Sequence, residues 1–168
     1  MLFRSGLAPD QQPTVQALGR QAVMLEEFLA REIDAKRLSL PLQPLPATAL
    51  VHGHCHQKAF GTLKSLRKLL AQVPQLHVQW IESSCCGMAG AFGYEAEHHA
   101  DSVAMAELVL LPAVRAAAPE ALLVASGTSC RHQIRDGAQR ESLHLAQLLQ
   151  AALPVPGTAP RPAPGTAP

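Results

Sequence analysis

Four cysteines are the residues of this chain whose type and spacing could support chemistry: Cys55, Cys85, Cys86 and Cys130. Two of them are adjacent, and adjacent cysteines are difficult to join in a disulfide because their Cα atoms are closer than an unstrained bridge requires. Their sulfurs can more easily bind different atoms of one polynuclear metal centre. Thiolates suit iron–sulfur clusters and zinc, and four cysteines are enough for either. The spacing matches no zinc-finger pattern and gives no support to metal-free thiol–disulfide exchange, since no two cysteines form a C-x-x-C pair.

A glycine-rich segment follows the adjacent cysteines, in the stretch ESSCCGMAGAFGYE at residues 82–95. Gly87, Gly90 and Gly93 can adopt positive φ angles and let the backbone approach a ligand closely. Their N–H groups could face a negatively charged ligand such as a thiolate-bound cluster. A phosphate-binding loop is the alternative, but the Lys-Ser/Thr ending of a nucleotide loop is missing here. We therefore expect these three glycines to contact the cofactor that the cysteines hold.

The composition is that of a small globular protein without a strongly charged interaction surface. Apolar residues make up 48% of the 168 residues and charged residues only 16%, with a net charge of +1, which predicts no nucleic-acid partner and no anionic membrane surface. No apolar run reaches the ~18 residues that a transmembrane segment needs, and residues 1–13 do not resemble a signal peptide. We expect a cytoplasmic protein, either free or held at the membrane surface by its partners. In that reducing compartment, cysteines suit metal binding or redox chemistry better than structural disulfides.

Short β-prone segments alternate with helical segments from residue 48 onward. Strands are expected at 48–52, 76–81 and 121–126, and helices at 57–73, 94–118 and 143–153. This alternation predicts an α/β fold with a small parallel sheet, βαβ crossovers and Rossmann-like layers of helices.

Every cysteine follows the carboxyl end of a predicted strand. Cys55 follows the first strand, Cys85 and Cys86 follow the second, and Cys130 follows the third, all in expected loops. Loops that leave the carboxyl ends of parallel strands share one edge of the sheet, and ligands bind at that edge. A single buried cysteine is more often a small apolar core residue than a ligand, but this does not account for four cysteines at one edge. We expect the four thiols to converge and bind a metal together.

Three segments are expected along the chain. Residues 1–47 contain an amphipathic helix at 14–35 and then a Pro-rich linker. Residues 48–153 form the cysteine-rich α/β domain. Residues 154–168 hold six of the fourteen prolines and repeat the sequence PGTAP, a composition typical of a disordered tail.

Three stretches resemble the cysteine-rich CCG domain: VHGHCHQKA at 51–59, ESSCCGMAGAFGYE at 82–95 and ASGTSCRHQI at 125–134. That domain occurs in a subunit of heterodisulfide reductase, in the iron–sulfur subunit of glycolate oxidase and in the C-terminal part of FAD-linked 2-hydroxy acid oxidases, which this chain resembles most. The resemblance implies an oxidoreductase component that transfers electrons through an iron–sulfur cluster of the 4Fe-4S type. The cluster ligands that it implies are Cys55, Cys85, Cys86 and Cys130.

Two features depart from the family pattern. The fuller pattern ends in C-x-x-C, and Gln133 stands in the place of the fifth cysteine, which leaves the cluster type open. Family members usually carry two such domains and often ferredoxin-type cysteine runs, whereas this chain has one domain, no such run and no FAD signature. We therefore expect a fragment or a split subunit that is inactive without a flavoprotein dehydrogenase, with a ferredoxin-type domain as a further candidate partner. A zinc-binding structural or regulatory module of the same fold is the alternative.

Three histidines and two basic residues lie near the cysteines in the sequence. The histidines could bind a metal, although hydrogen bonding around the site is the role we expect. The basic residues either offset the negative charge of a thiolate cluster or are ordinary surface charges, and both interpretations stand. These five residues are His52, His54, His56, Lys58 and Arg131.

Overall fold

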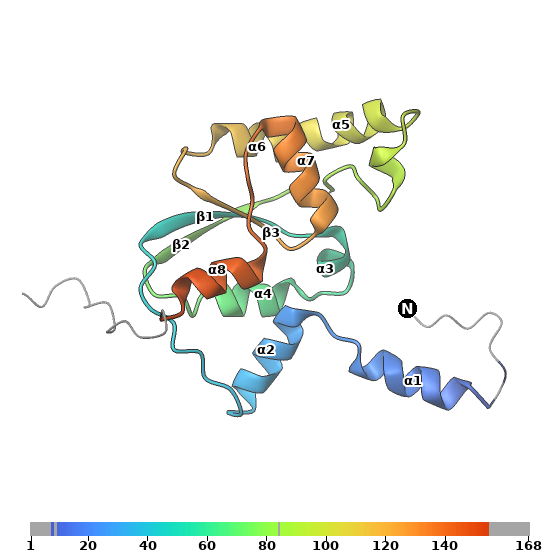
Figure 1. Cartoon of the computed structure of the whole chain (residues 1–168), viewed down its shortest axis with the longest axis vertical. Helices are drawn as coiled ribbons and strands as arrows, with labels where there is room; N and C mark the ends of the chain where they lie inside the picture. Colours follow the sequence, from blue (N-terminus) through green and yellow to red (C-terminus); the bar gives the residue numbers. More distant parts are fainter. Residues whose placement is uncertain (1–7, 9, 84, 155–168) are drawn as a thin grey trace, which may run out of the picture.

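The computed structural model describes residues 8, 10–83 and 85–154, and in this part of the chain it contains a parallel sheet with the strand order β2-β1-β3. β1 spans Ala47–His52, β2 spans Leu76–Ile81 and β3 spans Leu122–Ala125. Helices lie on both faces of the sheet (Figure 1). The structure therefore confirms the predicted α/β fold with layers of helices around a small parallel sheet.

Alternate residues of the central strand face two separate cores. Ala49 and Val51 of β1 face one core, and Leu50 faces the other. Because side chains alternate along a strand, His52 lies on the same face as Leu50. The helices are α4 (Leu63–Leu70) and α8 (Leu145–Ala152) on the face of Val51, and α6 (Leu110–Ala116) and α7 (Thr128–Ala138) on the face of Leu50.

The carboxyl ends of the three strands are in register, since His52 of β1 pairs with Ile81 of β2 and with Ala125 of β3. The chain leaves all three strands at this edge and soon reaches a cysteine each time. Two of these cysteines lie on helices rather than in the expected loops. Cys55 is the first residue of α3 (Cys55–Ala59), and Cys130 lies in the first turn of α7. A helical turn restrains a side chain more than a loop does, so both thiols have defined directions.

One proline divides the helical region that the sequence predicts at 94–118. Pro112 lacks an N–H, and in a continuous helix its ring would collide with the carbonyl group of Leu108. The single long helix is therefore wrong. The region instead contains the 3-10 helix η1 (Phe92–Tyr94), then α5 (His99–Glu107), and then α6 after a break. The helix predicted at 57–73 is likewise divided into α3 and α4, with Gly61 at a φ of 70° between them.

The N-terminal region forms two helices where the sequence predicts one at 14–35. α1 spans Gln12–Gln21 and α2 spans Leu25–Asp34, and Met24 between them has an extended backbone. α2 packs on α4, with Leu29 against the core of that face. α1 has no buried residue and extends away from the sheet (Figure 1).

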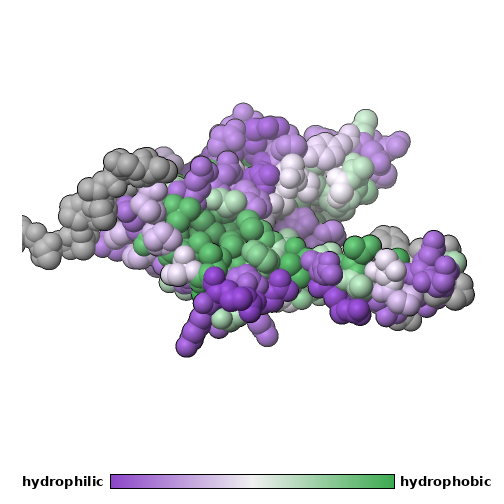
Figure 2. All heavy atoms as spheres, turned by 60° about the horizontal axis from the view of Figure 1, so that its bottom comes forward, coloured by the Kyte–Doolittle hydropathy of each residue, from purple (hydrophilic) through white to green (hydrophobic). Residues whose placement is uncertain are grey.

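Apolar side chains gather on the surface formed by α2 and α8 (Figure 2). A groove of about 200 Å³ lies there, lined by Leu25, Leu29, Leu40, Leu42, Ala146, Leu149, Gln150 and Leu153. None of the helices in the described part of the chain has the length and apolar character that a membrane span requires. Apart from Pro154, the predicted Pro-rich tail lies outside the described residues.

Candidate metal centre

Two buried cysteines form the centre of the candidate site. Cys86 follows β2 and is 3% exposed, while Cys130 on α7 is fully buried, and their Sγ atoms lie 3.3 Å apart. The Cys130 thiol donates to the Cys86 sulfur, and this hydrogen bond lowers the pKa of Cys86 and raises the pKa of Cys130. The pair thus favours a thiolate at Cys86 and a protonated thiol at Cys130. Metal binding would displace this proton, because thiols bind metals in their deprotonated form.

His52 is the third member of this buried group. It ends β1 on the side of α6 and α7 and is only 1% exposed. Its Nδ1 lies 2.8 Å from the Ser83 hydroxyl oxygen, whereas its Nε2 has no hydrogen-bond partner in the described part of the chain. The ligand atoms of His52, Cys86 and Cys130 all lie within 4.8 Å of one another. Sulfur and nitrogen ligands of a tetrahedral metal lie about 3.5–3.8 Å apart, so small side-chain movements would bring all three atoms onto one ion.

Cys55 and Cys85 lie at the rim of this group and are partly exposed. The Sγ of Cys55 lies 3.9 Å from Nε2 of His54, and Cys85 accepts a hydrogen bond from the Gly87 N–H at 3.3 Å. Burial, and then the charge of Cys85, raises the pKa of Cys55. After the effects of Cys86 and of burial, the charges of both rim cysteines also raise the pKa of Cys130. The four sulfurs are therefore close enough to interact electrostatically at one edge of the sheet.

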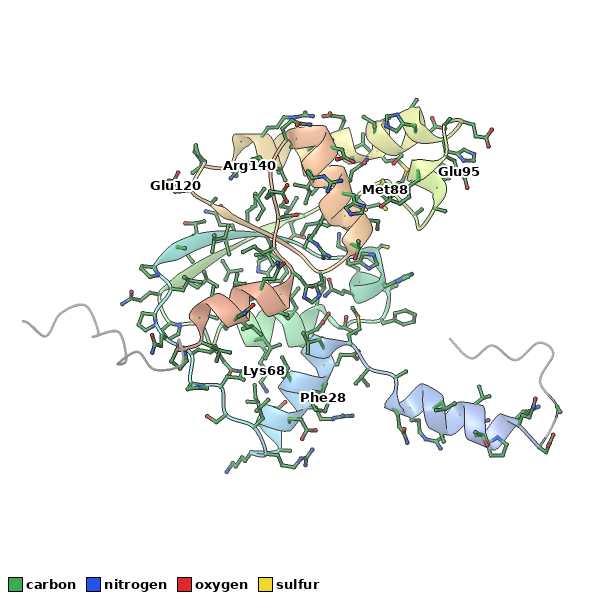
Figure 3. All side chains as sticks on the ribbon, viewed as in Figure 1. Phe28, Lys68, Met88, Glu95, Glu120 and Arg140 are labelled. Carbon is green, nitrogen blue, oxygen red and sulfur yellow. The ribbon has the colours of Figure 1, made fainter. Side chains whose placement is uncertain are left out.

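Ser102 anchors the segment that follows Cys86. Gly87 has a φ of 86°, and a Cβ atom built there would lie 2.0 Å from the Ser102 carbonyl oxygen. The Ser102 hydroxyl donates to Sδ of Met88 at 3.6 Å, and Met88 lies between α7 and η1 (Figure 3). Backbone packing against α5 therefore holds this segment beside the thiols, and only glycine fits at its first position.

The three glycines that the sequence singles out have different surroundings. The Gly87 N–H donates to the sulfur of Cys85, as expected for an amide that faces the site. The Gly93 N–H donates to the Met88 carbonyl oxygen at 2.9 Å, within the loop itself. Gly90 is exposed, has a φ of 72°, and has no atom within 4 Å of the position of a Cβ. Of these three amides, the Gly87 N–H is thus the one whose hydrogen bond reaches a thiol.

Gly127 lies against the thiols, whereas Gln133, the residue that stands in the place of the fifth cysteine, bonds to α5. The buried amide of Gln133 donates to the Ser102 carbonyl oxygen at 3.1 Å on α5. Gly127 lies against the site, because a Cβ built there would be 2.9 Å from Sγ of Cys130 and 2.2 Å from Cδ2 of His54. The ring of His54 occupies the space that a side chain at 127 would need.

Arg131 and Lys58 fix the segments that carry the cysteines. Arg131 Nη1 donates to the carbonyl oxygens of Ala125 at 3.0 Å and Ser126 at 2.9 Å, where β3 ends. Lys58 Nζ donates to the carbonyl oxygen of Ser83, in the segment that leaves β2. Both cations lie at the carboxyl edge of the sheet, so each restrains a backbone segment and also contributes positive charge near the thiols.

An open cavity of about 800 Å³ borders the site. His54 and Gly127 connect the site with the cavity. His54 lies beside Cys55 and Gly127 beside Cys130, and both residues also line the cavity. Residues 22–24, between α1 and α2, also line the cavity. Burial, and then the neighbouring His56, lowers the pKa of His54, which favours a neutral ring at this boundary. The cavity offers the rim of the site a route to solvent or to a partner.

Comparison with known proteins finds no matching family model and no matching solved structure. The chain is similar to one subunit of the anaerobic glycerol-3-phosphate dehydrogenase from two strains of Escherichia coli, K12 and O157:H7. In each case 126 residues align with 30% identity, which covers 75% of this chain and 31% of the relative. The chain thus spans about a third of the length of the curated relatives it matches, and the similarity is to one part of a dehydrogenase subunit.

Proposed function

We propose that this chain is an iron–sulfur-binding electron-transfer component of a flavin-linked oxidoreductase, and that residues 48–153 form a cysteine-rich domain of the CCG type. The observation that carries the proposal is the buried Cys86–Cys130 pair, with sulfurs 3.3 Å apart and with Cys55 and Cys85 at the same edge of the sheet. The similarity to a dehydrogenase subunit over three quarters of the chain supports it.

The residues at this edge fit a metal centre. A buried polar atom without a partner is costly, and so is a buried thiolate without a compensating charge. The Nε2 of His52 is a buried polar atom of this kind. The hydrogen bond from Cys130 lowers the pKa of Cys86, which favours a buried thiolate there. In our proposal Cys86 and Cys130 hold a 4Fe-4S cluster from the buried side, and Cys55 and Cys85 hold it from the rim. When bound, such a cluster would accept and donate electrons.

The dehydrogenase reaction itself belongs, in this proposal, to a partner. The sequence contains no fingerprint for FAD or a nicotinamide cofactor, so electrons would come from a flavoprotein subunit or domain, with a ferredoxin-type domain as a further electron carrier. The substrate class that we propose is a small anionic alcohol. This class includes the 2-hydroxy acids that the sequence motifs suggest and the glycerol 3-phosphate named in the relatives.

Iron and acid-labile sulfide in the anaerobically purified chain are the expected result of the first test. A cluster bound by the four thiolates would give the protein a brown colour and a visible absorption that dithionite bleaches. Metal analysis by mass spectrometry and a colorimetric sulfide assay measure both elements against protein concentration. Stoichiometric zinc without iron or sulfide, in a preparation made with ample iron, would contradict the proposal.

The isolated chain should not oxidise a substrate by itself, because in our proposal the flavin belongs to the partner subunit or domain. We expect no dye reduction with glycerol 3-phosphate, lactate or glycolate. The dithionite-reduced protein should nevertheless reduce ferricyanide in an amount that matches its iron–sulfur content, and this positive control shows that the centre is competent. Substrate turnover by the chain alone would place a catalytic centre here and overturn the assignment.

A structural or regulatory zinc module is the second candidate function. One observation favours it, namely that the ligand atoms of His52, Cys86 and Cys130 lie within 4.8 Å of one another. Two cysteines and one histidine suit a single tetrahedral zinc ion, which needs one further ligand, and Cys55 or Cys85 could supply it. The metal and sulfide analysis separates the two candidates, since zinc brings no sulfide.

A further inference from the structure

We propose that His52 is a ligand of the metal centre through its Nε2 atom, so that the centre is held by nitrogen as well as sulfur. This inference rests on the proposed metal-binding function and extends it to a residue outside the cysteine motifs. It also identifies Ser83 as the residue that positions the His52 ring.

The position of His52 follows from the sheet. It is the last residue of the central strand, and alternation along β1 turns its ring to the same side as Leu50. That side carries Cys86 and Cys130, which belong to the same core. A histidine that is only 1% exposed among apolar residues needs partners for both ring nitrogens. Its Nε2 is buried without a hydrogen-bond partner in the described part of the chain, and a ring nitrogen of His52 lies within 4.8 Å of both buried sulfurs.

The hydrogen bond to Ser83 prepares the ring for coordination. Nδ1 of His52 lies 2.8 Å from the Ser83 hydroxyl oxygen. If Nδ1 carries the proton and donates to Ser83, Nε2 keeps a free lone pair that can bind a metal. Metal-binding histidines commonly donate their second N–H to such an acceptor, which fixes both the tautomer and the ring orientation. The Ser83 backbone is itself held by Lys58, through the hydrogen bond to its carbonyl oxygen.

His54 lies nearby but is prepared for a different role. Its Nδ1 accepts a hydrogen bond from the His56 N–H at 3.2 Å, where it caps α3. An Nδ1 that accepts leaves the proton of a neutral ring on Nε2, which then can donate to a thiolate such as Cys55 at 3.9 Å. The hydrogen bonds therefore assign the two histidines different functions, with His52 as a ligand and His54 as a hydrogen-bond donor at the rim.

A neutral ligand also suits the charge of the site. The cysteines contribute up to four negative charges in a small, partly buried volume, and each further thiolate would add repulsion. An imidazole adds a ligand to the centre without adding charge. No further side chain fits at Gly127, where the ring of His54 fills the space. His52 lies on the buried side of the same group and supplies a ligand atom there.

Pulsed electron paramagnetic resonance on the dithionite-reduced, anaerobically purified full chain tests this inference. We expect a hyperfine coupling from one directly bound nitrogen, which changes to the ¹⁵N pattern when histidine is labelled with ¹⁵N. In His52→Leu the coupling should disappear and the iron content at a limiting iron concentration should fall about tenfold or more, in line with the loss of a metal-site partner. In Ser83→Ala metal affinity should fall about 10- to 100-fold, as for other partners of ligating histidines. The matched control is His56→Leu, an exposed histidine beside Cys55, which should keep the wild-type spectrum.

The possible outcomes separate this inference from the proposed function. Iron and sulfide in the wild-type chain without a histidine nitrogen coupling would overturn the ligand assignment and leave the iron–sulfur function in place. A wild-type chain that binds neither iron and sulfide nor zinc would overturn both. The ¹⁵N measurement uses the unaltered protein, so it decides the question even if His52→Leu folds poorly. Metal-free His52→Leu and wild type should have similar thermal midpoints, because leucine fills the buried space without an unpaired nitrogen.

Discussion

Serine in place of Cys86 or Cys130 is expected to abolish metal binding by the purified protein. Both sulfurs are buried and lie 3.3 Å apart, so a solvent ligand could not easily replace either of them. A serine hydroxyl is similar in size but is rarely deprotonated near neutral pH, whereas a cysteine beside a metal readily becomes a thiolate. We expect metal affinity to fall by at least about 100-fold, since even the loss of a partner that only contacts a ligand costs about 10- to 100-fold.

Serine at Cys55 or Cys85 should have a smaller effect, and these variants are the matched comparison. Both cysteines are partly exposed, so water or a neighbouring side chain could take the open position. We expect reduced iron content and an altered visible spectrum rather than complete loss. Iron, sulfide and zinc analysis of all four variants, purified in parallel, gives the ranking. Wild-type metal content in all four would mean that the sulfurs do not share a site. Equal loss in all four would contradict the distinction between a buried pair and a rim pair.

The sheet edge was accessible to sequence reasoning because it depends on two robust signals. The strand segments are short apolar runs between helical segments. This alternation predicts a parallel sheet, and the structure confirms that β1 pairs in parallel with β2 and with β3. Once the strands are parallel, their carboxyl ends must share one edge. The cysteines at 55, 85, 86 and 130 follow those ends, so their placement required no knowledge of side-chain packing.

Other features depend on packing or on single residues that periodicity does not reveal. The apolar stripe of the predicted helix at 94–118 continues through residue 114, yet Pro112 interrupts the helix because of a steric clash one turn earlier. Sequence reasoning treated His52 as a flanking residue, although strand alternation already places it on the inner face with Leu50. The roles of Ser102 and Gly127 arise only from tertiary contacts, with the backbone of Gly87 and with the ring of His54 respectively.

Alanine at Gly87 is expected to destabilise the protein and disorganise the metal centre together. The residue has a φ of 86°, where a side chain costs about 1–2 kcal/mol. Its Cβ would also lie 2.0 Å from the carbonyl oxygen of Ser102, and because that atom belongs to the α5 backbone it cannot move aside by rotation. Overpacking of this kind adds about 1–3 kcal/mol. The free energy of unfolding should therefore fall by about 2–5 kcal/mol in chemical denaturation of the metal-free protein.

Gly90→Ala is the matched control because it separates backbone conformation from steric contact. Gly90 has a similar φ of 72°, but the space around its Cβ position is open to 4 Å. Its substitution should cost only the conformational part, about 1–2 kcal/mol, and leave the iron content unchanged. The Gly87 variant should in addition lose iron, because a displaced segment moves Cys86 and removes the hydrogen bond from the Gly87 N–H to Cys85. Equal destabilisation and equal iron content in the two variants would show that the contact with Ser102 does not hold the thiols in place.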